Sequence, residues 1–401
     1  LDTNGDGQYD SSTTFLDQLP FPTDIKVWRD GVLICTAPNV LFARDTNGDG
    51  KADEVRTILS GFETHNYQAR VNSLAWGLDH WVYGAAGIFG GHVTNTHGHK
   101  IDLSNRDFRL RPDTGEVMSA SGRTQQGRVR DDWGNWFGCD NSTLLVHYPA
   151  AEHYSERQPT APPPPMSVNA APDNRLFPPP QIVQWALSGP PGLPTAACGL
   201  GILRSPLLGD SYNGNTFTCE PVNQLIHRRQ LASQGVTIQG QRAANELDRE
   251  FLWSTDQWFR PVQVKTGLDG SLYVVDMYRY LIEHPRFLSD AVRSQIDVRA
   301  GQDRGRIYRV VPRNGIVPAP AMADDLSRLS ILELARRFDT PNGTLRDLIH
   351  QLLWWAVEPR DHATPEFNAA VQVLLDLVAD SSHPAVRVQA LSLLAEWHRW
   401  P

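Results

Sequence analysis

The chain has 401 residues and a formal net charge of −8, which argues against a nucleic-acid-binding protein with its usual basic surface. Hydrophobic residues make up 40 % of the sequence, enough for a substantial core, but no run of about 18 apolar residues is present to span a membrane. The 31 glycines and 29 prolines favour turns and short strands over long helices.

The chain begins at Leu1, directly on an Asp/Asn-rich motif, and shows no signal peptide. We therefore interpret it as a processed or trimmed piece of a longer protein.

The motif D-T-N-G-D-G occurs in LDTNGDGQYD (1–10) and again in RDTNGDGKAD (44–53). Alternating short oxygen side chains with a following glycine are typical of calcium loops, but position 12 lacks the bidentate Glu of an EF-hand. Two interpretations stay open: weak structural calcium sites, or turns held by their own side chains. The candidate metal ligands are Asp45, Asn47, Asp49, Asp53, Asp2, Asn4, Asp6 and Asp10.

A repeated pattern indicates the fold. Five segments open with an Asp/Asn/Gly turn and continue as a short apolar strand. They are DGVLICTAPN (30–39), LDHWVYGAAG (78–87), DWGNWFGCDN (132–141), YNGNTFTCEP (212–221) and LDGSLYVVDM (268–277), and GRIYRVV (305–311) closes the series. A spacing of about 50 residues predicts a mainly β fold, a six-bladed β-propeller over residues 1–311. A β-sandwich is the alternative.

His65 lies in a polar loop directly before one of these strands, in GFETHNYQARVNSLAWGLDHWVYGAAG (61–87). Loops that enter the inner strands of a propeller line the mouth of its channel, so His65 is a candidate general base. A loop histidine held by hydrogen bonds fits the same pattern.

Arg123 and Arg260 occupy the place before their own strands that His65 has before its strand. Arginines in such positions favour a planar polyanionic ligand, because a guanidinium binds carboxylates through two parallel hydrogen bonds. Pairing with loop carboxylates is the alternative.

Other possible sites are weaker. The histidines of GGHVTNTHGHK (91–100) lack metal-ligand spacing and favour an exposed loop over a metal site. The four cysteines allow several pairings or none, and buried free thiols are at least as consistent with the sequence. They are Cys35, Cys139, Cys198 and Cys219.

Two further segments complete the organisation. The Pro-rich insert 159–180 lengthens one interval of the repeat and is expected to be exposed. After a linker (312–322), residues 323–401 show helical apolar spacing in segments 326–338, 343–357, 366–379 and 385–397, which suggests HEAT-like helical repeats.

The propeller segments resemble the soluble quinoprotein glucose/sorbosone dehydrogenase-like β-propeller superfamily. They are most similar to a bacterial family of predicted membrane-bound dehydrogenases built from a propeller, HEAT repeats and a haem domain. The matching stretches include DTNGDGKADE, HNYQARVNSLAWGLDHWVYGAAG, RDFRLRPDTGE, DDWGNWFGCDNS, YNGNTFTCEPVNQLIHR, STDQWFRPVQVKTGLDGSLYVVDMYR, IEHPR and GQDRGRIYRV. They cover most of residues 40–311.

This resemblance implies a periplasmic or secreted oxidoreductase that oxidises a sugar or sugar-derived alcohol with pyrroloquinoline quinone and calcium. It implies His65 as the base and Arg123, Arg260, Arg70 and Gln125 as cofactor-binding residues. Electrons would pass to a cytochrome c domain or protein, since this chain has no haem attachment motif. Two alternatives stay open: a non-catalytic propeller–HEAT module that binds a glycan or protein, and a carbohydrate lyase or hydrolase.

Overall fold

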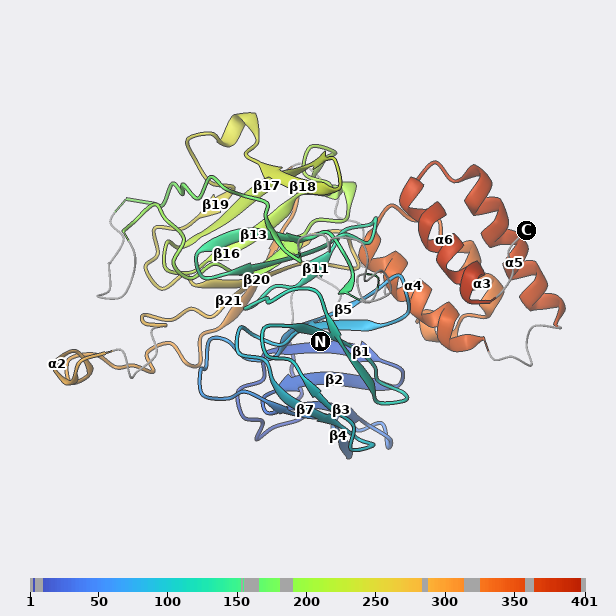
Figure 1. Cartoon of the computed structure of the whole chain (residues 1–401), viewed down its shortest axis with the longest axis horizontal. Coiled ribbons are helices and arrows are strands. Elements are labelled where there is room, and N and C mark those ends of the chain that lie inside the picture. Colours follow the sequence, from blue (N-terminus) through green and yellow to red (C-terminus); the bar gives the residue numbers. More distant parts are fainter. Residues whose placement is uncertain are drawn as a thin grey trace. The chain divides into compact units, whose positions relative to one another are not determined.

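The computed structural model describes residues 3, 10–152, 154, 166–180, 190–282, 288–313, 325–357 and 364–397. The strands of these residues form five antiparallel sheets, and four helices follow in the C-terminal part (Figure 1). The prediction of a mainly β propeller fold followed by helices is therefore confirmed.

The chain divides into two compact units. Unit 1 comprises residues 1–75 and 82–123, and unit 2 comprises residues 76–81 and 124–401. Unit 1 holds two sheets. The first has the order β1 (Asp24–Trp28), β2 (Gly31–Thr36), β3 (Asn39–Arg44), β4 (Glu54–Phe62), β7 (Gly91–Asn95) and β8 (Lys100–Asp102). The second has the order β10 (Glu116–Ala120), β9 (Asp107–Arg111), β6 (Val82–Ala85) and β5 (Asn72–Trp76).

Unit 2 holds three sheets and every described helix. The third sheet contains β11 (Val129–Arg130), β12 (Trp136–Asp140), β13 (Thr143–Tyr148) and β14 (Val168–Asn169). The fourth contains β15 (Cys198–Ile202), β16 (Thr216–Glu220), β17 (Leu225–Gln234) and β18 (Thr237–Gln241), with β19 (Leu252–Trp253) also paired to β17. The fifth contains β20 (Pro261–Thr266), β21 (Leu272–Asp276) and β22 (Arg306–Val310).

The predicted number of six blades is wrong, because the described strands form five. Each of the five repeated segments supplies the second strand of one sheet, namely β2, β6, β12, β16 and β21. The sixth blade was expected because the chain length was divided by a constant period. The hairpin β7–β8 instead extends the first sheet beyond β4, so its residues build no blade of their own.

The turn before these strands has the conformation that the Asp/Asn/Gly pattern predicts. Gly134, Gly214 and Gly270 have φ values of +86°, +76° and +81°, where a side chain would be strained. His80 takes the corresponding position before β6 with φ +63°. Arg29, two residues before β2, also has a positive φ of +53°. The turn therefore accepts a non-glycine residue at two of the five blades.

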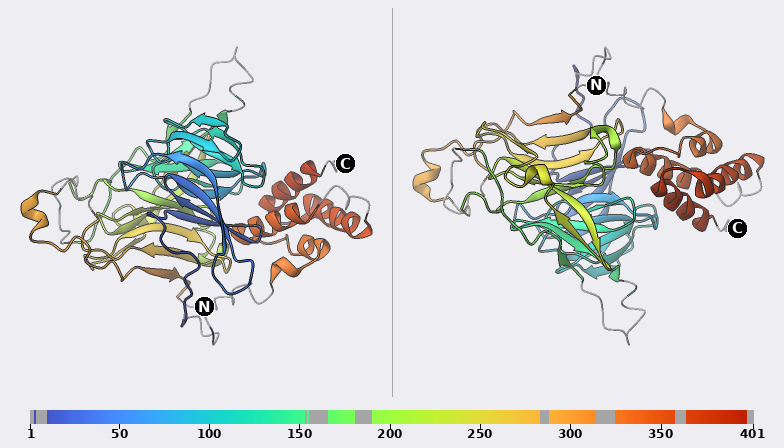
Figure 2. Two further views of the ribbon diagram at one scale, coloured as in Figure 1. Left: turned by 90° about the horizontal axis from the view of Figure 1, so that it is seen from below. Right: turned by 90° about the horizontal axis from the view of Figure 1, so that it is seen from above.

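The helices form a packed bundle with its own apolar core (Figure 2). Ser330 and Glu333 form a capping box at the start of its first helix, and Pro365 and Pro384 occupy first-turn positions, where the missing N–H costs nothing. The bundle comprises α3 (Ile331–Arg336), α4 (Gly343–Ala356), α5 (Pro365–Asp380) and α6 (Pro384–Glu396). The predicted helices are confirmed as helices, and their assignment as HEAT repeats stays a prediction. The short helices η1 (Pro206–Leu208), η2 (Ala244–Glu246), α2 (Asp290–Arg293) and η5 (Leu326–Arg328) lie elsewhere in unit 2.

The start of α4 is anchored on the sheets of unit 2. The Gly343 N–H donates to the Arg204 carbonyl at 2.7 Å, and the Asn342 amide donates to the Leu268 carbonyl at 2.8 Å. A Cβ atom on Gly343 would lie 2.6 Å from Nε of Arg204, so only glycine fits this contact. This anchorage joins the helices and sheets of unit 2 into one packed body.

One sequence expectation, the exposed Pro-rich insert, changes in this part of the chain. The described part of the Pro-rich insert, 166–180, contributes β14, and its Ala170, Ala171 and Leu176 are buried, so it is not wholly exposed. Residues 159–165 and most of the linker lie outside the described residues.

The four cysteines are buried free thiols. Among the helices that the structure describes, none has both the length and the apolar character to cross a bilayer.

Candidate functional site

The loop 86–90 between β6 and β7 is held tightly inside unit 1. A Cβ atom on Gly87 (φ +69°) would lie 2.4 Å from the carbonyl oxygen of Ala69, so this close approach requires glycine. The Glu63 N–H donates to the Gly90 carbonyl at 3.0 Å. The loop is therefore a fixed platform beside the segment that carries His65.

His65 forms a pair with Glu63 above this loop. The Nδ1 atom of His65 lies 3.1 Å from Oε2 of Glu63, and the two side chains are 50 % and 47 % exposed. The imidazole also meets the Phe89 ring edge-on at a centroid distance of 4.3 Å. A carboxylate at Nδ1 orients the ring and leaves Nε2 available to accept a proton.

Arg123 approaches the same loop. Its Nε donates to the Ile88 carbonyl at 3.1 Å, and the side chain is exposed. The buried Asp107 fixes both neighbours, since its carboxylate accepts the Ala86 N–H at 3.3 Å and its N–H donates to the Gly122 carbonyl at 2.8 Å. We refer to Glu63, His65, Phe89 and Arg123 as the His65 platform. Of the predicted site residues, His65 and Arg123 thus share contact with one loop.

Arg70 has a different environment from the one expected. Its guanidinium donates to the Thr64 carbonyl at 2.8 Å and lies over the rings of Phe21 and Tyr67, at 4.6 and 4.7 Å from their centroids. Arg70 therefore holds the loop that carries His65 in place, and its described contacts stabilise the fold.

Arg260 and Gln125, in unit 2, also bond to their own chain. Arg260 is buried, and its guanidinium donates to the carbonyls of Pro221, Arg279 and Tyr280 at 2.8, 3.1 and 3.0 Å. Burial lowers the pKa of Arg260 to about 10. The Gln125 amide donates to Oδ1 of Asn141 at 2.9 Å. The hydrogen-bond donors of Arg260 and Gln125 are thus used to stabilise the fold.

These contacts bear on the expected quinone. A quinone that carries several carboxylates requires free guanidinium or amide donors. Backbone carbonyls take the donors of Arg70 and Arg260, and Asn141 takes the amide of Gln125. These three residues do not fit the cofactor-binding role as they stand, which leaves Arg123 as the exposed arginine of the predicted set.

The loop that carries Asp45, Asn47, Asp49 and Asp53 joins β3 to β4. The Asp45 carboxylate accepts the N–H groups of Gly48 and Gly50, both at 2.7 Å, and these bonds lower its pKa. The side chains of Asn47 and Asp49 each accept an N–H two residues on. Among the described residues, no group of three or more His, Cys, Asp or Glu side chains is placed to hold a metal. The geometry is that of turns held by their own side chains, and the calcium site stays a prediction.

The first copy of the motif repeats one contact of the second. Oγ1 of Thr3 donates to Asp10 at 2.7 Å, as Oγ1 of Thr46 donates to Asp53 at 2.8 Å. Asp2, Asn4 and Asp6 lie outside the described residues. The shared contact indicates that the two copies close their loops in the same way.

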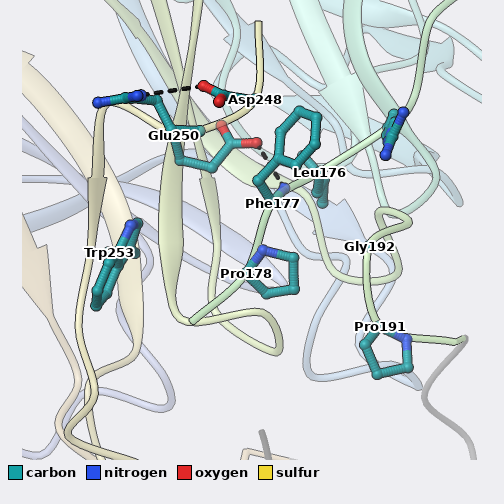
Figure 3. Close-up of a pocket in the computed structure, with 10 residues that line it drawn as sticks. Leu176, Phe177, Pro178, Pro191, Gly192, Asp248, Glu250 and Trp253 are labelled. Atoms are coloured by element: carbon teal, nitrogen blue, oxygen red, sulfur yellow. Dashed lines mark hydrogen bonds and ion pairs between the residues drawn. The ribbon is translucent and has the colours of Figure 1, made fainter. Parts of the chain in front are cut away.

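The sequence reasoning missed a cavity of about 730 Å³ in unit 2 (Figure 3). Its lining includes Arg175 and Phe177 from the Pro-rich insert, and Glu250 and Trp253 from the segment that ends in β19. The signal was present as the run D-N-R-L-F within the insert, but the surrounding prolines led us to interpret the whole segment as exposed.

The fold is a mainly β propeller of five blades with C-terminal helices. The chain belongs to the family described as Domain of unknown function (DUF7133), whose profile matches residues 1–314. No curated protein matches the chain.

Solved structures that the chain matches include a luciferin-regenerating enzyme, at 12 % identity, with coverage of 75 % of this chain and 80 % of that one, and a TM-score of 0.37. The soluble aldose sugar dehydrogenase of Escherichia coli is 15 % identical, with coverage of 63 % and 73 % and a TM-score of 0.34. A glucose dehydrogenase is 13 % identical, with coverage of 66 % and 95 % and a TM-score of 0.32. Similarities of this size do not define an activity.

Proposed function

We propose that the chain is an oxidoreductase that acts on a hydroxyl group of a sugar or sugar-derived alcohol, with His65 as the proton acceptor. The observation that carries this proposal is the Nδ1–Oε2 distance of 3.1 Å between His65 and Glu63. A histidine oriented by a carboxylate and open to solvent is the arrangement expected of a general base.

The other members of the platform have roles consistent with this chemistry. Phe89 buttresses the imidazole at a centroid distance of 4.3 Å, which limits the rotation of the ring. Arg123 is exposed beside the same loop and supplies a positive charge that favours an oxyanion formed when the hydroxyl loses its proton.

The carbinol carbon also loses a hydride, so two electrons must pass to a separate acceptor, which the added dye or quinone supplies in the assay below. A quinone and a calcium ion stay predictions, as do a periplasmic or secreted location and a cytochrome partner. No step is assigned to a quinone, because Arg70, Arg260 and Gln125 use their donors within the chain.

The proposal is tested by dye-linked oxidation over a panel of aldoses and sugar alcohols, with and without added pyrroloquinoline quinone and Ca²⁺. We expect dye reduction with at least one sugar, and a loss of roughly 10²- to 10⁴-fold in kcat for His65→Ala, as for removal of a general base. The matched control is His383→Ala, which should keep wild-type activity. His383 is a partly exposed histidine at the start of α6, and its side chain forms no capping hydrogen bond.

Two results would contradict the proposal. One is dye reduction that His65→Ala leaves unchanged. The other is product that forms with no electron acceptor, which would indicate the lyase or hydrolase alternative.

A non-catalytic module that binds a glycan is the second candidate, and one observation favours it. The guanidinium of Arg260 is bound by three backbone carbonyls, so the residue supports the fold and leaves fewer groups for a redox cofactor. This candidate predicts sugar binding by calorimetry without dye reduction under any of the conditions above.

A further inference from the structure

A second site lies in unit 2, in the cavity of about 730 Å³ between the described end of the Pro-rich insert and the segment before β19. Its size falls within the range of small-molecule sites in proteins. A neighbouring cavity of about 520 Å³ shares Arg175 and Phe177 with it. Every residue discussed for this site belongs to unit 2, so it shares no residue with the His65 platform of unit 1.

The floor of the cavity is rigid. The buried carboxylate of Glu250 accepts the Phe177 N–H at 3.0 Å and an N–H of Arg242 at 2.8 Å. It also pairs with Nδ1 of His227 at 2.7 Å. Glu250 therefore has its hydrogen bonds satisfied within the protein, and its main effect is to fix the position of Phe177.

Phe177 in turn positions Arg175. The guanidinium groups of Arg175 and Arg242 each lie 4.8 Å from the centroid of the Phe177 ring. Arg175 is exposed, and among the described residues no hydrogen bond or ion pair of its guanidinium is found. It is a cation held in place by stacking, with its donors free for a ligand.

The surroundings of Arg175 carry an excess of positive charge. Arg229 and Arg242 both face Asp173, at 3.8 and 4.0 Å, and Arg242 also pairs with Glu250 at 2.8 Å, so these two arginines and Arg175 meet two carboxylates. Nε of Arg242 is buried with no hydrogen-bond partner in the described part of the chain. Burial, with repulsion from Arg242, lowers the pKa of Arg229 to about 10. An anion near Arg175 would relieve this imbalance.

An aromatic surface faces the same cavity. Trp253 lines the cavity and is 45 % exposed, and its backbone is held in the fourth sheet by pairing with Leu225. Figure 3 shows Trp253 on one side and Pro178 and Pro191 toward the other. An exposed indole offers an apolar face for the C–H groups of a sugar ring, and the exposed pair of Asp248 and Arg249 at the rim, 3.1 Å apart, offers partners for hydroxyl groups.

We propose that this cavity binds an acidic carbohydrate, with a sugar ring on Trp253 and a carboxylate on Arg175. A single guanidinium matches a planar carboxylate through two parallel hydrogen bonds. The wall has no helix N-terminus or cluster of backbone N–H groups in its described lining, which a phosphate would favour. The site stands independently of the function proposed for His65.

The test is calorimetric titration of the purified chain with trigalacturonate and with its fully methyl-esterified form, which keeps the sugar rings but replaces each carboxylate by a neutral ester. We expect saturable binding of the acid and at least about tenfold weaker binding of the ester, since a hydrogen-bonded charge pair is lost. Arg175→Gln and Trp253→Ala should each weaken binding of the acid by about tenfold or more, and Trp253→Phe should keep most of the affinity.

Matched controls come from the same unit. Trp133, 56 % exposed, and Arg328, on the exposed helix η5, lie outside the cavity, so Trp133→Ala and Arg328→Gln should bind as the wild type does. His65→Ala should also bind normally, which separates this site from the oxidoreductase proposal. The proposal is overturned by equal binding of acid and ester, by the absence of saturable binding, or by wild-type affinity in folded Arg175→Gln and Trp253→Ala.

Discussion

The imidazoles of His80 and His350 meet inside unit 2, with their Nε2 atoms 3.0 Å apart. His80 occupies the turn position where three other blades have glycine, and His350 lies on α4. Both side chains are buried, and the indole of Trp354 stacks on His80 at a centroid distance of 5.6 Å. The turn that carries His80 therefore bonds the helical bundle through a side chain, at a position where three other blades have glycine.

This pair predicts loss of stability in acid. Burial, followed by the neighbouring His80, lowers the pKa of His350 well below its usual 6.5, against a smaller opposite effect of Asp347. In the unfolded chain His350 binds a proton as the pH falls through about 6.5, whereas in the native chain it stays neutral to lower pH. The free energy of unfolding should therefore fall as the pH drops below about 6.5. The slope from one such group approaches about 1.4 kcal/mol per pH unit.

The measurement is urea unfolding from pH 7.5 to 5. Other buried histidines contribute in the same direction, so the comparison is between the slopes of wild type and His350→Gln, with His383→Gln as the control. Equal slopes in all three proteins would show that the His80–His350 contact is not the acid-sensitive element.

Asp347 predicts a larger stability effect. Burial alone would raise its pKa, but the charges of Arg130 and Arg204, at 2.6 and 2.5 Å, hold the pKa well below its usual range. Asp347→Ala leaves two buried guanidinium groups without this partner, so we expect a loss of about 3–5 kcal/mol in the free energy of unfolding. Chemical denaturation measures it.

The matched control is a surface pair. Arg328 and Asp325 are 84 % and 51 % exposed, and solvent and salt screen such pairs. Arg328→Ala should therefore leave stability nearly unchanged. A small effect of Asp347→Ala would mean that Asp132, which also bonds Arg204 at 2.6 Å, supports the arginines alone.

The sequence predicted the type of fold because turn chemistry and strand patterning are local. Each segment with the Asp/Asn/Gly turn became the second strand of a sheet. The number of blades was not accessible in this way, because the pairing of β4 with β7 is a long-range choice that no local pattern records. The hairpin β7–β8 joins the first sheet only through that pairing.

The site was predicted in part for a similar reason. His65 and Arg123 were found because each precedes a repeated strand, and both contact the loop 86–90. The same rule selected Arg260, whose guanidinium is bonded to three carbonyls from distant segments. Burial and hydrogen-bond satisfaction depend on the whole fold, so sequence position alone does not separate a binding arginine from a structural one.

The loop 45–53 predicts a specific pattern of amide protection. Because the Asp45 carboxylate accepts the N–H groups of Gly48 and Gly50, both amides should resist hydrogen exchange in the presence of a calcium chelator. Asp45→Ala should remove that protection. Protection that appears only after Ca²⁺ is added would instead support the calcium site.

Substitution of Gly87 tests whether the loop 86–90 requires glycine at its close approach to Ala69. Gly87→Ala combines a strained φ of +69° with a Cβ placed 2.4 Å from the Ala69 carbonyl oxygen, so it should destabilise the chain and displace the loop under His65. Gly98→Ala shares the positive φ, at +77°, but has no atom within 4 Å, and should cost only about 1–2 kcal/mol of backbone strain. Thermal unfolding compares them, and equal losses would show that the close approach at Gly87 is relaxed in solution.

Substitution of Glu63 tests its role as the residue that positions the base His65. Glu63→Gln keeps the size of the side chain but removes the carboxylate 3.1 Å from Nδ1 of His65, so the imidazole loses the group that orients it. We expect kcat for sugar oxidation to fall by about 10- to 100-fold, less than for His65→Ala. Stability should change little, because both side chains are about half exposed. A wild-type kcat in Glu63→Gln, or a loss of activity in it with no loss in His65→Ala, would show that the pair does not act as a base and its orienting carboxylate.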